Sequence, residues 1–255
     1  MNRIRHVAVV IPARDEADTI EATIEAVDRA RTRLPAGVSS SCVVVVDASS
    51  DATGALIERR TRASSDGRRS TASIVVRTAH GCVGAARSVG CRVALAGSLH
   101  RPRHVWLANT DADTVVPGNW LAAQLELAER DVTAIAGAVE LGVDVDDTLR
   151  ADFAATYELS PDGTHRHVHG ANLGTRGDVY LLAGGWRRLH TGEDHDLWAR
   201  LGQVTKCVSS TAITVRTSAR LVGRAPAGFA RDIARIVAAG ESTIAVAAAL
   251  EPTVA

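Results

Sequence analysis

The stretches HVAVVIPARDE at residues 6–16 and CVVVVDASSDAT at residues 42–53 decide the fold. Each opens with an unbroken, largely β-branched apolar run and then becomes polar. Such runs are typical of strands that are buried on both faces of a parallel sheet. Between them, the apolar residues of segment 18–31 recur at helical spacing, and Asp18 is the expected N-cap. The order of these segments predicts a strand–helix–strand unit.

The same alternation continues along the first half of the chain. We expect further strands at 74–77 and 104–109 and helices at 51–62, 83–95 and 120–129. This order predicts an α/β fold with a mostly parallel, doubly wound sheet. Ligands of such sheets bind beyond the carboxyl ends of the strands, so the polar residues found there are the first candidates for a functional site.

The second half of the chain is less regular. We expect strands at 133–141, 167–175 and 212–218 and helices at 193–201 and 233–250. The acidic stretch 144–162 has no pattern that assigns it to either class.

Composition narrows the class of protein. The chain has 255 residues, near the upper limit for a single hydrophobic core, so we expect one domain. A formal net charge of zero argues against a nucleic-acid-binding surface. The four cysteines form no CxxC pair, which disfavours a zinc or redox motif. We find no signal peptide and no run approaching the roughly 20 apolar residues of a membrane span, and therefore expect a cytoplasmic enzyme without a transmembrane segment.

The strongest chemical signal is an acid pair in WLANTDADTVVP at residues 106–117. Asp111 and Asp113 follow a predicted strand, and in extended backbone their side chains share a side, with Cα atoms roughly 6–7 Å apart. Two such carboxylates repel each other unless a cation or a donor lies between them. A hard divalent cation that bridges phosphate oxygens would meet this need. The alternative is a pair of solvated turn aspartates that cap the next helix.

A second acidic cluster lies in TGEDHDLWARL at residues 191–201. Glu193, Asp194 and Asp196 lie at the start of a predicted helix, where acids interact favourably with the helix dipole. Capping explains one or two of them, and we expect Asp196 to be the cap. Crowding should raise the pKa of one acid, which suits a group that takes up a proton during catalysis.

Two further residues are candidates for nucleotide contacts. Asp47 ends a predicted strand and could accept a hydrogen bond from a base N–H; alternatively it is a turn residue before an N-cap at Asp51. Arg87 lies in HGCVGAARSVG at residues 80–90, where small residues allow close approach to a ligand. A surface role for Arg87 is the alternative.

The histidines at 165, 167 and 169 would share one face of an extended strand. This spacing suits a zinc site geometrically. We favour a solvated or acceptor-facing row of histidines instead.

Over about residues 6–202, the chain resembles the family 2 glycosyltransferases of GT-A fold. The family's P-A-x-N-E-like turn, D-D-G-S-x-D-G-T, G-x-x-x-A-R-N and D-x-D segments match residues 12–16, 46–53, 81–88 and 111–113. Its G-x-N-x-x-x-R, G-G-F and E-D-x-D-L segments match residues 170–176, 184–186 and 193–197. The motifs occur in order and at suitable spacing, which argues against coincidence.

Three positions depart from the family pattern. Arg14 stands where the family often has an aromatic residue that stacks on the base; a guanidinium plane can also stack, so this leaves the base preference open. Val46 replaces the first acid of the D-D pair, and Ser88 replaces an asparagine. None of the three removes the metal ligand or the catalytic base that the resemblance implies.

The resemblance implies an inverting, hexosyltransferase-type enzyme. It would move a sugar from a nucleoside-diphosphate-sugar to an acceptor hydroxyl with the help of Mn²⁺ or Mg²⁺. The implied nucleotide-binding residues are Pro12, Ala13, Arg14, Glu16, Asp47, Arg87 and Asp111. The implied metal ligands are Asp113 and Asp111. Asp194 would be the general base, with Glu193 as its rival, and Asn172 and Trp186 would line the acceptor side.

We expect the single domain to divide into two halves and a C-terminal segment, of which the last lies beyond the resemblance. Residues 1–115 would form the nucleotide-sugar-binding half and 116–224 a smaller acceptor-side half. Residues 225–255 would form a C-terminal helix that covers the sheet or makes a homodimer contact, in preference to a helix on a membrane surface. The alternatives in function are a retaining GT-A transferase, a sugar-nucleotide pyrophosphorylase and a non-catalytic sugar-nucleotide-binding module. The donor sugar, the nucleotide and the acceptor stay open.

Overall fold

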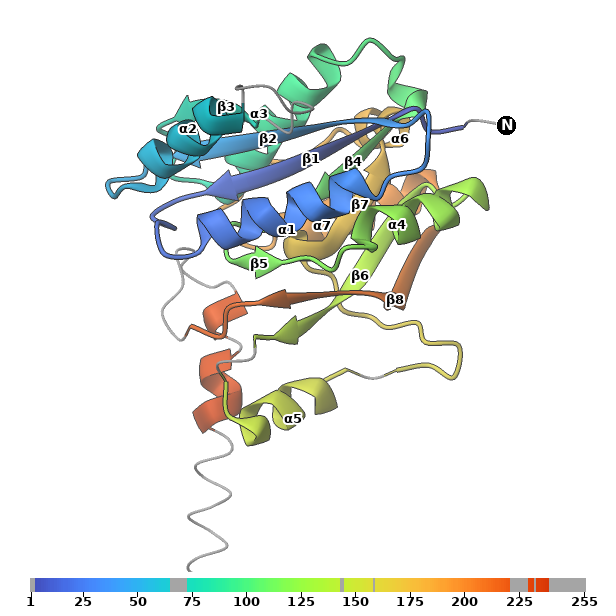
Figure 1. Ribbon diagram of the computed structural model, residues 1–255. Coiled ribbons are helices and arrows are strands. Elements are labelled where there is room, and N and C mark those ends of the chain that lie inside the picture. Colours follow the sequence, from blue (N-terminus) through green and yellow to red (C-terminus); the bar gives the residue numbers. More distant parts are fainter. Residues whose placement is uncertain are drawn as a thin grey trace, which may run out of the picture.

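The computed structural model describes residues 3–64, 73–142, 145–157, 159–220, 229–231 and 233–238. Within them an eight-stranded mixed sheet has the order β3-β2-β1-β4-β7-β6-β8-β5 (Figure 1). The strands are β1 (His6–Ala13), β2 (Ser39–Asp47), β3 (Ile74–Thr78), β4 (Val105–Asn109), β5 (Thr114–Val115), β6 (Ala134–Leu141), β7 (Leu173–Arg176) and β8 (Cys207–Thr217). The α-helices are α1 (Ile20–Thr32), α2 (Thr53–Ser64), α3 (Val83–Ala96), α4 (Trp120–Glu129), α5 (Asp147–Ala155), α6 (Gly177–Leu182) and α7 (Glu193–Val204). Two 3₁₀ turns, η1 (Pro102–His104) and η2 (Gly170–Asn172), precede β4 and β7.

The first four strands of the sheet, β3, β2, β1 and β4, run parallel. The predicted α/β class and doubly wound arrangement are therefore confirmed, and this half of the sheet gathers the carboxyl ends of its strands at one edge. Beyond β4 the sheet becomes mixed: β7 is antiparallel to β4 and β6, β8 is parallel to β6, and β5 is antiparallel to β8.

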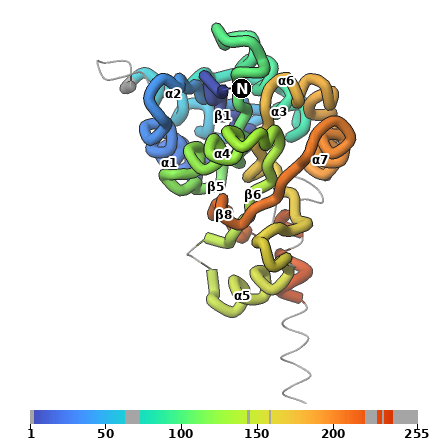
Figure 2. The backbone as a smooth tube through the Cα atoms, turned by 90° about the vertical axis from the view of Figure 1, so that its right-hand side faces the viewer, coloured from blue at the N-terminus to red at the C-terminus, as the bar shows by residue number. Residues whose placement is uncertain are grey.

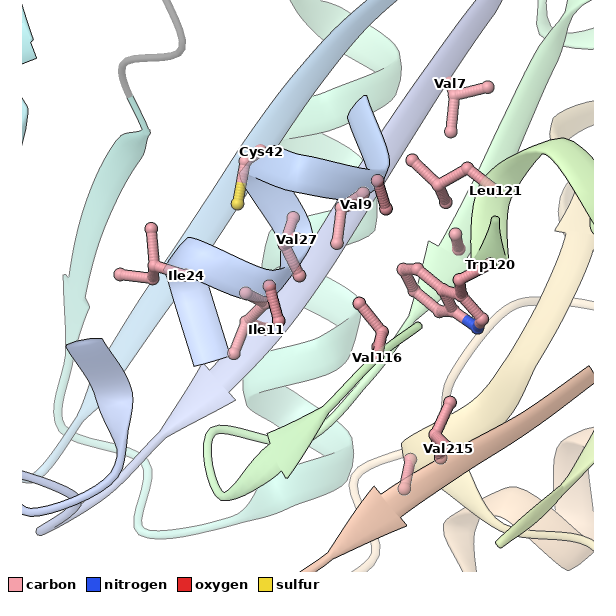
Figure 3. Packing of buried hydrophobic residues seen from close by; sticks show 14 of the residues in the cluster. Val7, Val9, Ile11, Ile24, Val27, Cys42, Val116, Trp120, Leu121 and Val215 are labelled. Atoms are coloured by element: carbon pink, nitrogen blue, oxygen red, sulfur yellow. The ribbon is translucent and has the colours of Figure 1, made fainter. Parts of the chain in front are cut away.

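Burial of both sheet faces explains the continuous apolar runs in the sequence. On β1, Val7, Val9 and Ile11 pack with residues of α1 and α4, as Figure 3 shows. The intervening Ala8 and Val10 belong to the opposite cluster, which includes residues of α3, α6 and α7. Each fully buried aliphatic side chain contributes roughly 1.5–3 kcal/mol of hydrophobic stabilisation. Successive side chains of β1 point to opposite faces of the sheet, yet they do not alternate between apolar and polar, because neither face contacts water.

The start of α1 differs from the prediction. Thr19, not Asp18, occupies the N-cap position, and no side chain caps the helix. The Thr19 hydroxyl donates instead to the carboxylate of Glu16, at 3.0 Å. The helix is entered through a turn in which the Glu16 carbonyl accepts from the backbone N–H of Ile20, at 3.0 Å. The prediction of an Asp18 cap was therefore wrong.

The second half departs further from the expected elements. The strand expected at 167–175 is limited to β7, and η2 precedes it, so the histidines at 165, 167 and 169 lie outside regular structure. The unassigned acidic stretch contains α5, which Asp146 caps by accepting from the Thr148 N–H at 2.6 Å. The short helix α6 was not predicted at all.

Only part of the expected C-terminal helix is described. Residues 229–231 and 233–238 are helical and lie beside α5 below the main sheet (Figures 1 and 2). Ile233 is fully buried and packs with Leu141 and Phe153. The rest of the 225–255 prediction, and most of the loop at 63–73, fall outside the described residues. Among those described, no helix combines the length and apolar character that a bilayer crossing requires.

Candidate active site

A cavity of about 530 Å³ opens at the carboxyl ends of the parallel strands. All of the predicted nucleotide-binding, metal-binding and catalytic residues line it: Pro12, Ala13, Arg14, Glu16, Asp47, Arg87, Asp111, Asp113, Glu193 and Asp194. They come from the ends of β1, β2 and β4, from α3 and from the start of α7. The fold thus brings to one place residues that are separated by up to 182 positions in the chain (Pro12 to Asp194).

Asp47 shapes one wall of the cavity. Its carboxylate accepts hydrogen bonds from the Thr78 hydroxyl at 2.8 Å and from the backbone N–H groups of His80 at 2.7 Å and Cys82 at 2.8 Å. Burial would raise its pKa, but the hydrogen bonds from Cys82, Thr78 and His80 outweigh it and hold the pKa below its usual value. Asp47 is therefore an ionised residue that fixes the loop leading into α3.

Arg87 is buried in the wall, with only 1% of its side chain exposed. Its guanidinium pairs with Asp111, lies 3.5 Å from the Glu193 carboxylate and sits 5.2 Å from the centre of the Trp186 ring. A Cβ atom at residue 170 would overlap the guanidinium, so Gly170 makes room for it. Burial alone would lower the Arg87 pKa, but Asp111 and Glu193 more than compensate, and the pKa is raised. The surface alternative for Arg87 was wrong.

The structure brings Asp111 and Asp113 to the cavity, as the sequence predicted. They lie after β4, which ends at Asn109, and Asp113 is 10% and Asp111 36% exposed at the side chain. Asp113 accepts from the Thr217 hydroxyl at 3.3 Å through Oδ1. Burial and the neighbouring Asp111 charge raise the pKa of Asp113 to about 6. Asp113 is thus a largely buried acid that also experiences the negative charge of Asp111.

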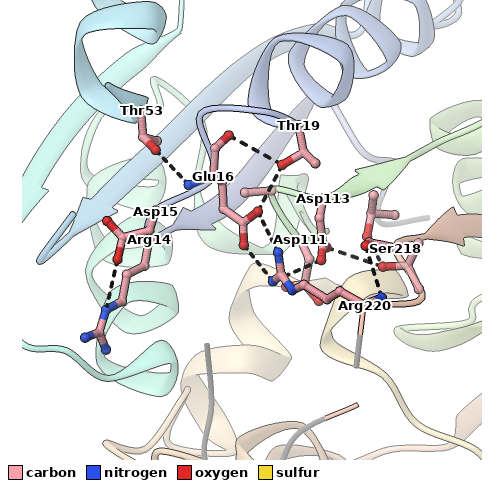
Figure 4. Close-up of polar contacts among 12 residues, drawn as sticks. Arg14, Asp15, Glu16, Thr19, Thr53, Asp111, Asp113, Ser218 and Arg220 are labelled. Atoms are coloured by element: carbon pink, nitrogen blue, oxygen red, sulfur yellow. Dashed lines mark hydrogen bonds and ion pairs between the residues drawn. The ribbon is translucent and has the colours of Figure 1, made fainter. Parts of the chain in front are cut away.

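Arg220 completes this side of the site and was missed by the sequence analysis. Its two terminal nitrogens bond both carboxylate oxygens of Glu16, at 2.8 and 2.6 Å, and Nη2 lies 3.1 Å from Oδ2 of Asp113 (Figure 4). The pairing of Thr114 with Thr217 brings the end of β8 beside Asp113. The only signal in the sequence was a charged residue two positions after the strand predicted at 212–218.

Glu193 and Asp194 begin α7 but have different surroundings. Glu193 is 8% exposed at the side chain, and burial raises its pKa to about 7, against the opposing effect of Arg87. Asp194 is partly exposed; its Oδ2 accepts from the Gly170 N–H at 2.9 Å and its Oδ1 from the His195 N–H at 2.8 Å. The acid with the raised pKa is thus Glu193, and the acid with a fixed orientation at the cavity is Asp194.

Asp196 does not cap α7, contrary to the prediction. It pairs with Arg187 at 3.0 Å and with Arg200 at 2.5 Å. Hydrogen bonds from Arg200 lower its pKa against a small effect of burial. Two nearby guanidinium groups thus take the place of the backbone amides as partners of this carboxylate.

The histidines form an aromatic wall on the other side of the cavity. His167 and His169 line the cavity, the His167 ring stacks on Tyr157 at 4.2 Å, and the Phe229 ring meets His169 edge-on at 5.6 Å. Burial lowers the pKa of His169 to about 4, despite the nearby Asp194 charge, so this imidazole is neutral at pH 7. Among the described residues, no group of three or more acids, cysteines and histidines is placed to hold a metal ion, so the zinc interpretation has no ligand set.

Asn172 and Trp186 lie behind the wall and do not line the cavity. The Asn172 amide donates to the carbonyls of Ala138 and Ile213, at 2.8 and 2.9 Å, and its oxygen accepts from the Trp120 indole at 2.9 Å. Trp186 is 4% exposed and supports Arg87. The structure corrects the expected placement: both residues hold the wall in position from the inside.

Solved structures that resemble this one include S. aureus TarS and a mannosyltransferase from Pyrobaculum calidifontis. S. aureus TarS 1–349 in complex with UDP-GlcNAc has 15% sequence identity and a TM-score of 0.64, over 86% of this chain and 60% of that one. The mannosyltransferase PcManGT from Pyrobaculum calidifontis, in complex with GDP-Man and Mn²⁺, has 21% identity and a TM-score of 0.61, over 87% and 59%. The chain thus spans about 60% of the length of these two solved chains and 36% of a longer TarS chain. At these identities the likeness establishes the fold, as the resemblance predicted.

A comparison by sequence with curated proteins found no match. The family model described as glycosyl transferase family 2, in contrast, matches residues 8–188. This range includes β1 to β7 and the acid pair at 111–113, and it covers most of the chain. The chain therefore belongs to glycosyl transferase family 2.

Proposed function

We propose that this protein transfers a sugar from a nucleoside-diphosphate-sugar to an acceptor hydroxyl, with inversion at the anomeric carbon and with a divalent cation. One observation carries the proposal. The nucleotide-side residues Asp47 and Arg87, the acid pair Asp111 and Asp113, and the acid Asp194 line one cavity at the strand ends. Family membership supports the reaction class.

The donor class is supported by the similar structures. TarS was solved with UDP-GlcNAc and PcManGT with GDP-Man, so both bind nucleoside-diphosphate-sugars on this fold. In this chain, the cavity of about 530 Å³ lies in the range expected for a small-molecule site. Asp47, Arg87 and Arg14 face it from the nucleotide side.

The residues of the acid pair fit a hard divalent cation. Carboxylate oxygens are the ligands that Mg²⁺ and Mn²⁺ prefer. Glu16 and Asp113 both pair with the Arg220 guanidinium, and burial together with the neighbouring Asp111 charge raises the pKa of Asp113, an unfavourable interaction that a cation would relieve. Asp113 and Asp111 would hold the cation, and the donor phosphates would supply further oxygens. When bound, the cation neutralises the negative charge that builds on the leaving diphosphate.

Asp194 is the residue placed to act as the base. Hydrogen bonds from Gly170 and His195 fix its carboxylate at the cavity wall. As the acceptor oxygen attacks the anomeric carbon, its proton passes to Asp194, and the bond from that carbon to the diphosphate oxygen breaks on the opposite face. General-base assistance of this type typically contributes about 10²–10⁴-fold. Glu193 is less suited, because it is buried against Arg87.

The test is nucleotide binding measured by calorimetry. UDP, GDP and dTDP are titrated into the protein with and without Mn²⁺, and into Asp113→Asn. One of the three should bind, Mn²⁺ should tighten binding by about tenfold or more, and Asp113→Asn should remove that gain. Asp147→Asn, at a side chain that is 94% exposed, serves as the control. Absence of binding for all three nucleotides in both conditions would contradict the proposed function.

A further inference from the structure

Arg220 has an arrangement that neither the family pattern nor the proposed mechanism uses. It follows β8, yet its guanidinium holds Glu16 from the β1–α1 turn and Asp113 from the segment after β4. The bond with Glu16 is bidentate, at 2.8 and 2.6 Å, and only Nη2 reaches Asp113, at 3.1 Å. The anchor of Arg220 is therefore Glu16, and its contact with Asp113 is the second and longer one (Figure 4).

The two acids of the pair are neutralised in different ways. Asp111 is paired with Arg87, whose side chain is 1% exposed and enclosed by Gly170 and Trp186, so this arginine has no room to move. Arg220 is 28% exposed and, among the described residues, is the cation in contact with Asp113. The guanidinium that neutralises Asp111 is therefore fixed in position, and the guanidinium that neutralises Asp113 can move.

A divalent cation and this guanidinium compete for the same oxygen. A Mg²⁺ or Mn²⁺ ion bound to Oδ2 of Asp113 would sit about 2.0–2.2 Å from it. A guanidinium nitrogen already lies 3.1 Å from that oxygen. The two positive charges would then be only a few ångströms apart in a largely buried site, where their repulsion is poorly screened. A bound diphosphate would reduce this repulsion, because its negative charges can pair with the divalent cation and with the guanidinium at the same time.

We propose that Arg220 is a built-in counter-cation that withholds Asp113 from the metal until the donor arrives and then becomes a ligand of the donor diphosphate. The inference rests on the proposed function, which supplies both the cation at Asp113 and the donor diphosphate. Arg220 keeps its bidentate bond with Glu16, releases Asp113 to the metal and turns the freed N–H toward a phosphate oxygen. Arginine suits this task, since its planar fork serves carboxylates and phosphates equally well. Metal and donor binding thereby favour each other.

The test compares Arg220→Gln with wild type and with two other variants. Arg220→Gln removes the charge and nearly keeps the length, and Arg220→Lys keeps the charge but loses the fork. Arg216→Gln is the matched control: Arg216 lies near the end of β8, four residues before Arg220, is 61% exposed, pairs with Glu140 at 3.7 Å and does not line the cavity. Circular dichroism and thermal unfolding first establish that each variant is folded.

Mn²⁺ binding is measured by electron paramagnetic resonance on the protein without nucleotide. Arg220→Gln should bind Mn²⁺ about tenfold more tightly than wild type, while Arg220→Lys and Arg216→Gln should stay close to wild type. An unchanged or weakened Mn²⁺ affinity in Arg220→Gln would overturn the competition. This arm needs no nucleotide, so it tests the competition for Asp113 separately from donor binding.

Nucleotide binding is then measured by calorimetry at saturating Mn²⁺, with whichever of UDP, GDP and dTDP wild type binds. Arg220→Gln should lose about tenfold in affinity and Arg220→Lys less. Normal affinity in Arg220→Gln would overturn the diphosphate role and leave the proposed function intact. Failure of wild type itself to bind any of the three would contradict both the proposed function and the diphosphate role.

Discussion

The guanidinium of Arg87 lies 3.5 Å from the carboxylate of Glu193, and both side chains are almost completely buried, at 1% and 8% exposure. The same guanidinium pairs with Asp111. Asp111 is therefore the partner that keeps Arg87 charged, and Glu193 can take up a proton without leaving the arginine unpaired. This arrangement links the stability of the fold to the chemistry of the cavity, and two predictions depend on it.

Arg87→Met should destabilise the protein strongly at pH 7.5. Removing one partner of a fully buried ion pair costs about 3–5 kcal/mol, and here the buried Glu193 and the 36% exposed Asp111 lose their counter-charge, so we expect the lower end of that range. The measurement is urea unfolding followed by circular dichroism. Arg216→Gln, which breaks an exposed pair with Glu140, should change the free energy of unfolding by less than about 1 kcal/mol. An unchanged midpoint for Arg87→Met would mean that the wall does not depend on this ion pair.

Glu193 should make stability fall as pH rises from about 4.5 to about 7. Its pKa is raised from 4.5 to about 7 in the folded state, so within this window the native protein holds a proton that the unfolded chain releases. The free energy of unfolding therefore decreases toward higher pH, by up to about 3 kcal/mol. The pKa of Asp113 is likewise raised, to about 6, so this residue adds a further decrease in the free energy of unfolding as pH rises.

Glu193→Gln isolates the first of these two contributions. The variant cannot titrate at position 193 and keeps Arg87 paired with Asp111, so its stability should fall less between pH 5 and pH 8 than that of wild type. Urea midpoints at the two pH values give the comparison. Equal falls in wild type and variant would show that Glu193 is ionised throughout the window.

Asn172→Ala should act on stability and not on ligand binding. The Asn172 amide joins β6 and β8 through the Ala138 and Ile213 carbonyls and accepts from Trp120, and each buried group left without a partner costs about 1–3 kcal/mol. We expect a loss of about 2–4 kcal/mol in urea unfolding. Asn119→Ala, at an exposed residue whose side chain caps no helix, should be close to neutral. A folded Asn172→Ala protein with normal stability and altered substrate binding would restore the acceptor-side role.

The local sequence pattern was sufficient to predict the parallel half of the sheet and the candidate site residues at the ends of its strands. The apolar runs of β1 and β2 are buried on both faces, so composition alone marks them, and Asp47, Asp111 and Asp113 follow directly from where those strands and β4 end. Ligands of such sheets bind at the carboxyl ends of the strands, so these residues could be assigned to one site although no local pattern connects them.

Residues whose roles come from long-range packing could not be predicted in this way. Arg220 pairs with Glu16, which lies 204 positions away in the sequence, and the residues around Arg220 form no motif. Asn172 matched a family motif, but only the packing of β6, β8 and η2 shows that its amide faces inward. The histidines at 165, 167 and 169 alternate like a strand, yet Tyr157 and Phe229 rings, not strand pairing, hold them in position.

Asp194→Asn is the decisive variant for the mechanism. The substitution keeps the shape and an acceptor for the Gly170 N–H, removes the basicity, and should cut kcat by about 10²-fold or more with nucleotide affinity nearly unchanged. Glu193→Gln should cost less. Asp178→Asn is the matched control: Asp178 is likewise the second residue of its helix and accepts from the next N–H, at 2.9 Å, but does not line the cavity.

The assay uses turnover with an acceptor found by screening, and nuclear magnetic resonance of the product gives its anomeric configuration. Inversion together with a crippled Asp194→Asn enzyme is the expected result, since only an inverting reaction needs a base on the acceptor side. Near-normal kcat in Asp194→Asn with inversion would move the role to Glu193, whose raised pKa of about 7 suits proton uptake. Retention of configuration would instead remove the need for a base. The role of Asp194 would then be to hold the Gly170 backbone in position, which keeps open the space that Arg87 occupies.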